Sequence, residues 1–387
     1  VEALRAVIER YDILRTAVLW EGLPEPVQVV WRRAPLEVEE VGLDPDGGDA
    51  EQQMCAGVSS RSDRIDVRQA PLLRLFIAHD EANGRWVMLQ LFHHLAIDHA
   101  TVEMMRQEIQ AHLLGRAGHV LAPMPFRNYV AQSRLGVPRA EHEAFFRKML
   151  GDVDEPTAPF GLTDVHGDGL GIAEAYRPVD ADLARRLRAR ARALGVSAAS
   201  VCHLAWAQVL ARVSGREDVV FGTVLFGRMQ GGEETDRALG LFINTLPVRL
   251  RVGEAGVEES VRQTHTLLAE LLRHEHAPLA LAQRCSAVAA PAPVFSGLLN
   301  YRHSTAAGQV PMSEPEAWAG VQLLRAEERT NYPLVLSVDD LGEGFGLTAQ
   351  VQSPIDPARV CTYMHRALEV LVASLADDPS APLRSLD

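Results

Sequence analysis

Hydrophobic and polar positions along the chain predict helices and strands that alternate from the N-terminus onward. The chain opens with apolar residues at helical spacing, at Leu4, Val7, Ile8, Tyr11 and Leu14. Two β-rich runs follow, TAVLW and PVQVVW, with a Gly-Pro turn between them. LLRLFIAH and RWVMLQLFHH predict two more strands, because the acidic, Gly-containing DEANG between them is typical of a hairpin turn.

The same periodicities continue through the rest of the chain. Helices are predicted over 99–115, 139–150, 181–194, 197–213, 257–273 and 357–375. Strands are predicted at VVFGTVLF, LPVRLRV, VFSGLLNY, YPLVLSVDD and FGLTAQV. Helices and strands mix without a regular βαβ period, which predicts a mixed α/β fold.

The segment from 151 to 172 is dense in Gly, Pro and Asp, which interrupts regular structure. We therefore predict an N-terminal lobe over 1–155, a linker over 156–172 and a C-terminal lobe over 173–387. A chain of 387 residues is also longer than one hydrophobic core usually supports, which favours two lobes.

Composition narrows the class of protein. Hydrophobic residues make up 47% and charged residues 23%, and no apolar run approaches the ~20 residues of a membrane helix. A formal net charge of −13 argues against a general nucleic-acid binder. Cys55, Cys202, Cys285 and Cys361 are far apart and form no CxxC, which predicts reduced thiols in a cytoplasmic protein.

The stretch LFHHLAIDHAT, residues 91 to 101, holds the strongest candidate chemistry. Strand alternation sends His93 and His94 to opposite faces, and His99 has no Cys or Glu beside it, so a shared metal is disfavoured. Two interpretations remain open. His94 is either an acid–base group exposed in a cleft or a core histidine, with Asp98 capping the helix that begins near His99.

HHLAIDH is similar to the HHxxxDG signature of the condensation domains of nonribosomal peptide synthetases. Four further segments resemble motifs of that family in the family's order. They are RYDILRT at 10–16 (RHxxLRT), GREDVVFGTVLFGR at 215–228 (a strand and GR turn), LGLFINTLPVR at 239–249 (GxFxNTxxxR) and RTNYPLVLSV at 329–338 (RxxxNxPL). Through these five segments, the chain is identified as a member of this family.

The resemblance implies two lobes, each like chloramphenicol acetyltransferase, in a V shape with the active site in a tunnel between them. The family's first strand and helix would precede Val1, so we expect that the chain is excised from something longer. The resemblance implies no metal, nucleotide or redox cofactor of its own. Substrates are expected on the 4′-phosphopantetheine arms of donor and acceptor carrier domains, beside an adenylation domain, with no nucleic-acid or membrane partner.

The family pattern also implies residue roles. It makes His94 the catalytic residue, which orients the incoming amine and takes its proton as the tetrahedral intermediate forms. His93 supports the site. Asp98 is expected to be architectural, paired with Arg15 of the LRT segment, because a buried carboxylate needs a partner and a guanidinium binds it in a bidentate manner. Arg10 is the alternative partner.

Three residues bear on substrate binding. Asn331 matches the asparagine of the late motif, where its amide would donate to a substrate carbonyl; the alternative is a turn asparagine before Tyr332. His99 replaces the family's Gly and Tyr11 replaces its His. An imidazole at position 99 is expected to narrow or re-polarise the tunnel mouth, or else to be a tolerated substitution at the helix start.

The expected function is an amide-forming acyltransferase of secondary metabolism, as in antibiotic biosynthesis. It would join a donor acyl or peptidyl thioester to the amine of an acceptor aminoacyl thioester. Three alternatives stay open: a starter condensation domain that takes a fatty acyl group from coenzyme A or a carrier, an epimerization domain, and a catalytically silent recruitment domain of the same fold.

Overall fold

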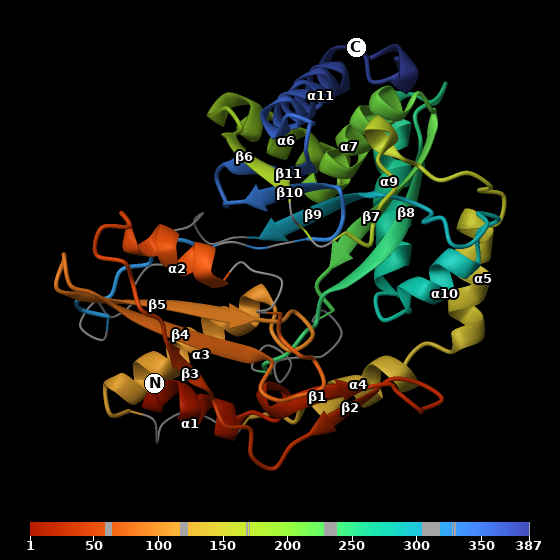
Figure 1. The fold of residues 1–387 in the computed structure, drawn as a ribbon. Coiled ribbons are helices and arrows are strands. Elements are labelled where there is room, and N and C mark those ends of the chain that lie inside the picture. The colour runs from red at the N-terminus through yellow and green to blue at the C-terminus, as the bar shows by residue number, and fades with distance from the viewer. Residues whose placement is uncertain are drawn as a thin grey trace. The chain divides into compact units, whose positions relative to one another are not determined.

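The computed structural model describes most of the chain and divides it into two compact units. The described residues are 1–58, 64–116, 123–167, 169, 171–227, 238–303, 318–326, 328 and 330–386. The first unit contains Val1–Arg134 with residues 238–242 and 318–326, and the second contains the other described residues. Both units combine helices with sheets, which confirms the mixed α/β class (Figure 1).

The first unit has two small sheets. Its elements are α1 (Glu2–Arg10), a 3₁₀ turn (Ile13–Arg15), β1 (Thr16–Leu19), β2 (Val27–Val30), β3 (Val38–Glu40), α2 (Ala50–Val58), β4 (Leu73–Asp80), β5 (Arg85–Phe92), α3 (His99–Leu113) and α4 (Phe126–Leu135). β1 pairs with β2 antiparallel. The other sheet has the order β3-β4-β5, with β3 parallel and β5 antiparallel to β4.

Strand alternation gives the β3-β4-β5 sheet two apolar faces. Phe76 and Val87 pack with Met54 of α2 on one face. Leu75 packs on the other face with the core that includes Ile8 of α1 and residues of α3. Figure 1 shows α2 on one side of this sheet and α1 and α3 on the other. The turn after β5 thus leaves a sheet whose central strand, β4, is packed on both sides, while β5 itself exposes Trp86 and Met88.

The second unit is built on one six-stranded sheet. Its elements are α5 (Arg139–Leu150), β6 (Ile172–Pro178), α6 (Ala181–Leu194), α7 (Ala198–Ser214), β7 (Asp218–Leu225), β8 (Asn244–Arg251), α9 (Val257–Leu272), α10 (Leu279–Arg284), β9 (Gly297–His303), β10 (Leu334–Asp340), β11 (Phe345–Gln352) and α11 (Pro357–Asp377). The strand order is β6-β11-β10-β9-β7-β8. β9 is parallel to β10 and β7, and the remaining pairs are antiparallel.

Helices α6, α7, α9 and α11 pack together beside this sheet (Figure 1). α7 is buried over most of its length, and its Trp206 is fully buried. α5 joins the same core through Phe146 and Leu150, so the predicted linker at 156–172 lies inside the second unit rather than between units. The break in periodicity there marks a loop, but the apolar face of α5 decides where that helix packs.

Two further sequence expectations can be compared with the structure. All four cysteines are free, and Cys202, Cys285 and Cys361 are buried. No single helix of the described residues has the length and apolar character needed to cross a membrane. Only α6 and α7 taken together meet that test, and they are bent by 111° at the break between them.

Candidate active site

The candidate site begins where β5 ends. We predicted a strand that runs through His94, but β5 stops at Phe92, and both histidines lie in the turn that leads to α3. The His93 amide still donates to the Leu72 carbonyl at 3.0 Å. The Ala96 amide then donates to the His93 carbonyl at 3.1 Å, which reverses the chain.

His93 supports this turn with its ring. The Leu95 amide donates to His93 Nδ1 at 3.1 Å, so that nitrogen acts as the acceptor. Burial, together with the neighbouring His94, lowers the pKa of His93 below its ordinary value. A neutral, hydrogen-bonded ring at this position stabilises the turn.

His94 is half-buried, and its ring is held in one tautomer. Its Nδ1 lies 3.0 Å from the Ile97 carbonyl oxygen. A carbonyl only accepts hydrogen bonds, so Nδ1 carries the proton in this contact, and in the neutral ring Nε2 then carries the lone pair. The Phe92 ring lies edge-on to the imidazole, with 6.3 Å between ring centroids. This arrangement meets the tautomer requirement of the acid–base interpretation.

Asp98 is buried and caps α3, as the second interpretation required of it. Its Oδ1 accepts from the Thr101 amide at 2.8 Å. Its Oδ2 accepts from the Phe242 amide at 3.2 Å, which joins the turn to the GLF part of the motif at 239–249. The capping role is confirmed, and the same carboxylate holds a second segment.

The predicted ion pair between Asp98 and Arg15 is wrong for the described part of the chain. The Arg15 guanidinium donates to the main-chain carbonyls of Trp31 and Arg32. The physical reason is that Arg15 ends the 3₁₀ turn beside β2, where main-chain carbonyls accept from its guanidinium. Arg10, the alternative partner, forms an ion pair with Glu108 at 3.5 Å.

A second link joins α3 to residues 238–242. The buried Thr101 hydroxyl donates to the Gly240 carbonyl at 2.8 Å. The Gly240 amide in turn donates to the Thr101 hydroxyl oxygen at 2.9 Å. Gly240 has φ +148°, and a Cβ there would overlap the Phe126 ring, so glycine is required. Both motifs are visible in the sequence, but their contact is not, because neither motif encodes its partner.

The two departures from the family pattern have different surroundings. The Tyr11 hydroxyl is hydrogen-bonded to Glu108 of α3. Burial first, and then Glu108, raise the pKa of Tyr11 to about 12. Tyr11 therefore connects the end of α1 to α3. His99 is the first residue of α3 and is exposed.

Asn331 precedes β10 and is exposed. Its Nδ2 donates to the Val165 carbonyl at 2.5 Å. The amide thus ties the approach to β10 to the loop before β6, which matches the turn interpretation. A contact between Asn331 and substrate stays a prediction. Arg228 and Arg329, which belong to the resembling segments, lie outside the described residues.

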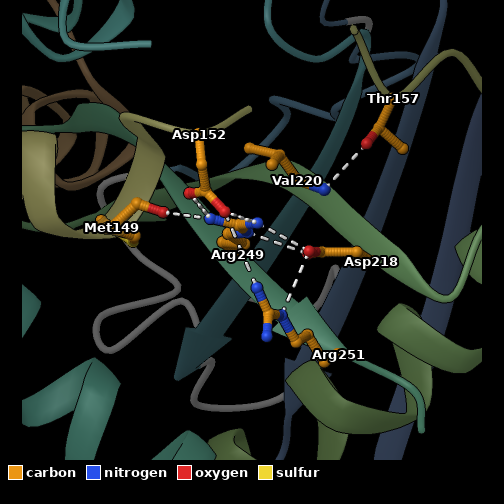
Figure 2. A network of polar contacts seen from close by, with 7 residues as sticks. All are labelled: Met149, Asp152, Thr157, Asp218, Val220, Arg249 and Arg251. Carbon is orange, nitrogen blue, oxygen red and sulfur yellow. Dashed lines mark hydrogen bonds and ion pairs between the residues drawn. The ribbon is translucent and has the colours of Figure 1, made fainter. Parts of the chain in front are cut away.

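The arginine of the motif at 239–249 is structural. Figure 2 shows the Arg249 guanidinium between Asp218 of β7 and Asp152, which follows α5. Its Nη2 lies 2.7 Å from Asp218 and 3.0 Å from Asp152, and its Nη1 donates to the Met149 carbonyl at 2.9 Å. Hydrogen bonding to Arg249 lowers the pKa of Asp152 to about 2. These partners were not predicted.

Asn244 of the same motif is also structural. Its side chain donates to the Glu275 and Ala277 carbonyls, both at 2.8 Å. Residues 240 and 242 of this motif therefore bind α3 and its cap, and Asn244, at the start of β8, binds the loop that holds Glu275 and Ala277.

Comparison with known proteins confirms the family. The family model described as "Condensation domain" matches residues 1–387, so the chain belongs to the condensation-domain family, whose members form amide bonds as acyltransferases. The family works with substrates bound to carrier phosphopantetheine. The chain is 51% identical over its whole length to part of malpibaldin synthetase of Mortierella alpina, and it spans 7% of that relative's length.

Solved structures with low sequence identity share the fold. One is a holo four-domain nonribosomal peptide synthetase, AB3403, bound to AMP and glycine. It has 15% identity and a TM-score of 0.76, and the match covers 100% of this chain and 30% of that one. Another is the X-domain in its complex with OxyB from teicoplanin biosynthesis, with 18% identity, a TM-score of 0.75, and coverage of 100% and 86%.

Proposed function

We propose that this chain joins a donor acyl or peptidyl thioester to the amine of an acceptor aminoacyl thioester. Both substrates are carried on the phosphopantetheine arms of carrier domains in a nonribosomal peptide synthetase, next to an adenylation domain. Family membership supports the reaction class. The observation that carries the residue assignment is the His94 ring, whose Nδ1 is engaged by the Ile97 carbonyl so that Nε2 is the basic nitrogen.

The reaction forms one C–N bond and breaks one C–S bond. The acceptor amine attacks the donor carbonyl, loses a proton, and the donor thiolate leaves and takes up a proton. His94 Nε2 orients the amine and accepts its proton as the tetrahedral intermediate forms. Asp98 acts as a positioning residue, because it caps α3 and holds the turn that carries His94.

Two exposed residues are proposed substrate contacts. His99 is exposed five positions after His94, at the start of α3. Asn331 is exposed before β10, with one amide hydrogen engaged by Val165. His99→Gly tests the first of these, since an unchanged range of accepted substrates would exclude a role for the imidazole. We also propose a cytoplasmic location, which the four free cysteines support.

A single-turnover assay with loaded donor and acceptor carrier domains tests the reaction. Intact mass of the acceptor carrier reports transfer. We expect His94→Ala to lower the rate about 100-fold, within the range typical of one acid–base group. The matched control is His79→Ala, since His79 is an exposed histidine of β4 in the same sheet. Circular dichroism shows whether both variants stay folded.

The outcomes separate the alternatives. Transfer that proceeds equally well in His94→Ala contradicts the role of His94. Transfer from a fatty acyl donor alone favours a starter domain. Exchange of the acceptor α-proton without transfer favours an epimerization domain, and the absence of both reactions in the wild type favours a recruitment domain.

A further inference from the structure

A cluster of three side chains of the kinds that bind metals lies in the second unit, whereas the turn that carries His94 belongs to the first unit. α11 places His365 and Glu369 one helical turn apart on the same face, and Asp180 precedes α6. His365 Nε2 lies 3.0 Å from Asp180 Oδ2, and His365 Nδ1 lies 3.6 Å from Glu369 Oε1. One ligand atom from each residue lies within 4.8 Å of the other two.

His365 is the unusual member of the cluster. Its side chain is only 4% exposed. Its Nε2 is buried and has no hydrogen-bond partner in the described part of the chain, since its contact with Asp180 lacks hydrogen-bond geometry. Buried ring nitrogens are normally satisfied by a hydrogen bond or by a metal. When Nε2 is unprotonated, it is therefore available as a ligand for a metal ion beside the Asp180 carboxylate.

The Asp180 side chain does not cap α6. Asp180 is the N-cap residue of α6, a position where an aspartate usually accepts from the first amides of the helix. The Asp180 side chain makes no such bond and approaches His365 instead. Within the described part of the chain, Asp180 and His365 thus lack the hydrogen bonds that are common for such residues, and their side chains approach each other.

We propose that Asp180, His365 and Glu369 bind a zinc ion, with water as the fourth ligand. One imidazole nitrogen and two carboxylate oxygens are typical zinc ligands. Bonds of about 2.0 to 2.2 Å in a tetrahedron place ligand atoms about 3.3 Å apart. The separation of 3.0 Å is close to this value, and Glu369, whose side chain is 37% exposed, can move to complete the site. The ion fastens the start of α6 to α11.

A zinc titration of chelator-treated protein tests the site. Competition with a chromogenic chelator gives stoichiometry and affinity, and Co²⁺ in place of Zn²⁺ reports tetrahedral geometry by its visible absorption. We expect one zinc per chain and a rise in melting temperature on zinc addition. Asp180→Asn and Glu369→Gln should each weaken zinc binding by about tenfold or more. Both residues are at least partly exposed, so these variants are expected to fold.

Asp182→Asn is the matched control. Asp182 lies two residues after Asp180 in the first turn of α6 and pairs with Arg185 and Arg186, so its loss changes the local charge without touching the cluster. Zinc affinity should be unchanged in this variant. Two results would each overturn the proposal: no uptake of zinc by the wild type, or uptake that survives both ligand substitutions. In the first case, destabilisation by Asp180→Asn would show that the cluster is only an ion-paired histidine.

Discussion

At the scale of single residues, Asp98 shows how main-chain amides bind a buried carboxylate. The main-chain amides of Thr101 and Phe242 donate to its two oxygens. Each hydrogen bond to a charged acceptor contributes about 1.5 to 3 kcal/mol. Arg15 is not among the described partners of Asp98, because its guanidinium binds main-chain carbonyls near β2.

A double-mutant cycle on Arg15 and Asp98 tests whether the two side chains interact directly. Asp98→Ala removes the α3 cap and leaves the Phe242 amide unsatisfied, so we expect a loss of about 2 to 3 kcal/mol in the free energy of unfolding. Arg15→Ala should cost about 1 kcal/mol. Without a direct pair, the two losses should add within about 0.5 kcal/mol. Urea unfolding of both single variants and the double variant provides the measurement.

A coupling energy above about 2 kcal/mol between the two sites would show that they interact in solution. Asp98→Asn is the control, because its amide oxygen still accepts from Thr101 and it should therefore retain part of the cap.

The sequence singles out His94 as the candidate catalytic residue, but the hydrogen-bond partner of its ring could not be predicted. The residue type and its place in HHLAIDH identified the imidazole. Its tautomer depends on the carbonyl of Ile97, and every residue has a carbonyl, so no residue type signals that bond. For the same reason, the second hydrogen-bond partner of Asp98 could not be predicted, because it is a main-chain amide 144 positions along the chain.

At the scale of elements, long periodic segments were predicted well. α5 and α6 begin and end as the periodicity indicated, at Arg139–Leu150 and Ala181–Leu194. Short elements such as β3 and α10 were missed, because three to six residues carry too little periodicity and depend on tertiary packing. β5 was predicted two residues too long for a related reason: a hydrogen bond across the following turn, not hydropathy, ends it.

Glycine in β7 gives an element-scale prediction. Gly222 lies opposite Leu298 of β9, and a Cβ there would overlap the Leu298 side chain and approach the Phe295 ring at 2.5 Å. Gly222→Ala should therefore lower the free energy of unfolding by about 1 to 3 kcal/mol through overpacking of a rigid core. Gly253→Ala is the control, because a Cβ at that position meets no atom within 4 Å. Chemical denaturation compares the two variants, and equal stability would contradict this packing.

At the scale of the whole molecule, the sequence indicated two parts but not how the chain is shared between them. The predicted division was a single break at 156–172. In the structure, residues 238–242 and 318–326 belong to the first unit, although they come from the second half of the chain. Such an exchange is decided by contacts such as that between Thr101 and Gly240, which are distant in sequence.

The stability of the molecule should decrease as the pH is lowered, because of buried neutral histidines. His203 of α7 is fully buried in the core, where its Nδ1 lies 2.7 Å from the Ala199 carbonyl and its Nε2 lies 2.8 Å from the Thr223 hydroxyl. Burial lowers the pKa of His203 to about 4. In the unfolded chain its pKa is about 6.5. The unfolded state therefore binds a proton that the folded state excludes as the pH drops from about 6.5 to about 4.

Because the unfolded state holds more protons in this range, the free energy of unfolding rises with pH there. His203 alone should reduce the free energy of unfolding by about 3 kcal/mol between about pH 6.5 and about pH 4, and none of this loss occurs above pH ~6.5. His93, His142, His274 and His276 also have pKa values lowered by burial, so they add to the decline. The variant His203→Gln tests this, because it keeps polar atoms near Thr223 but does not titrate. Between about pH 6.5 and about pH 4, its free energy of unfolding in urea should decline by about 3 kcal/mol less than that of the wild type. Equal declines in the two proteins would show that His203 is not buried as a neutral ring.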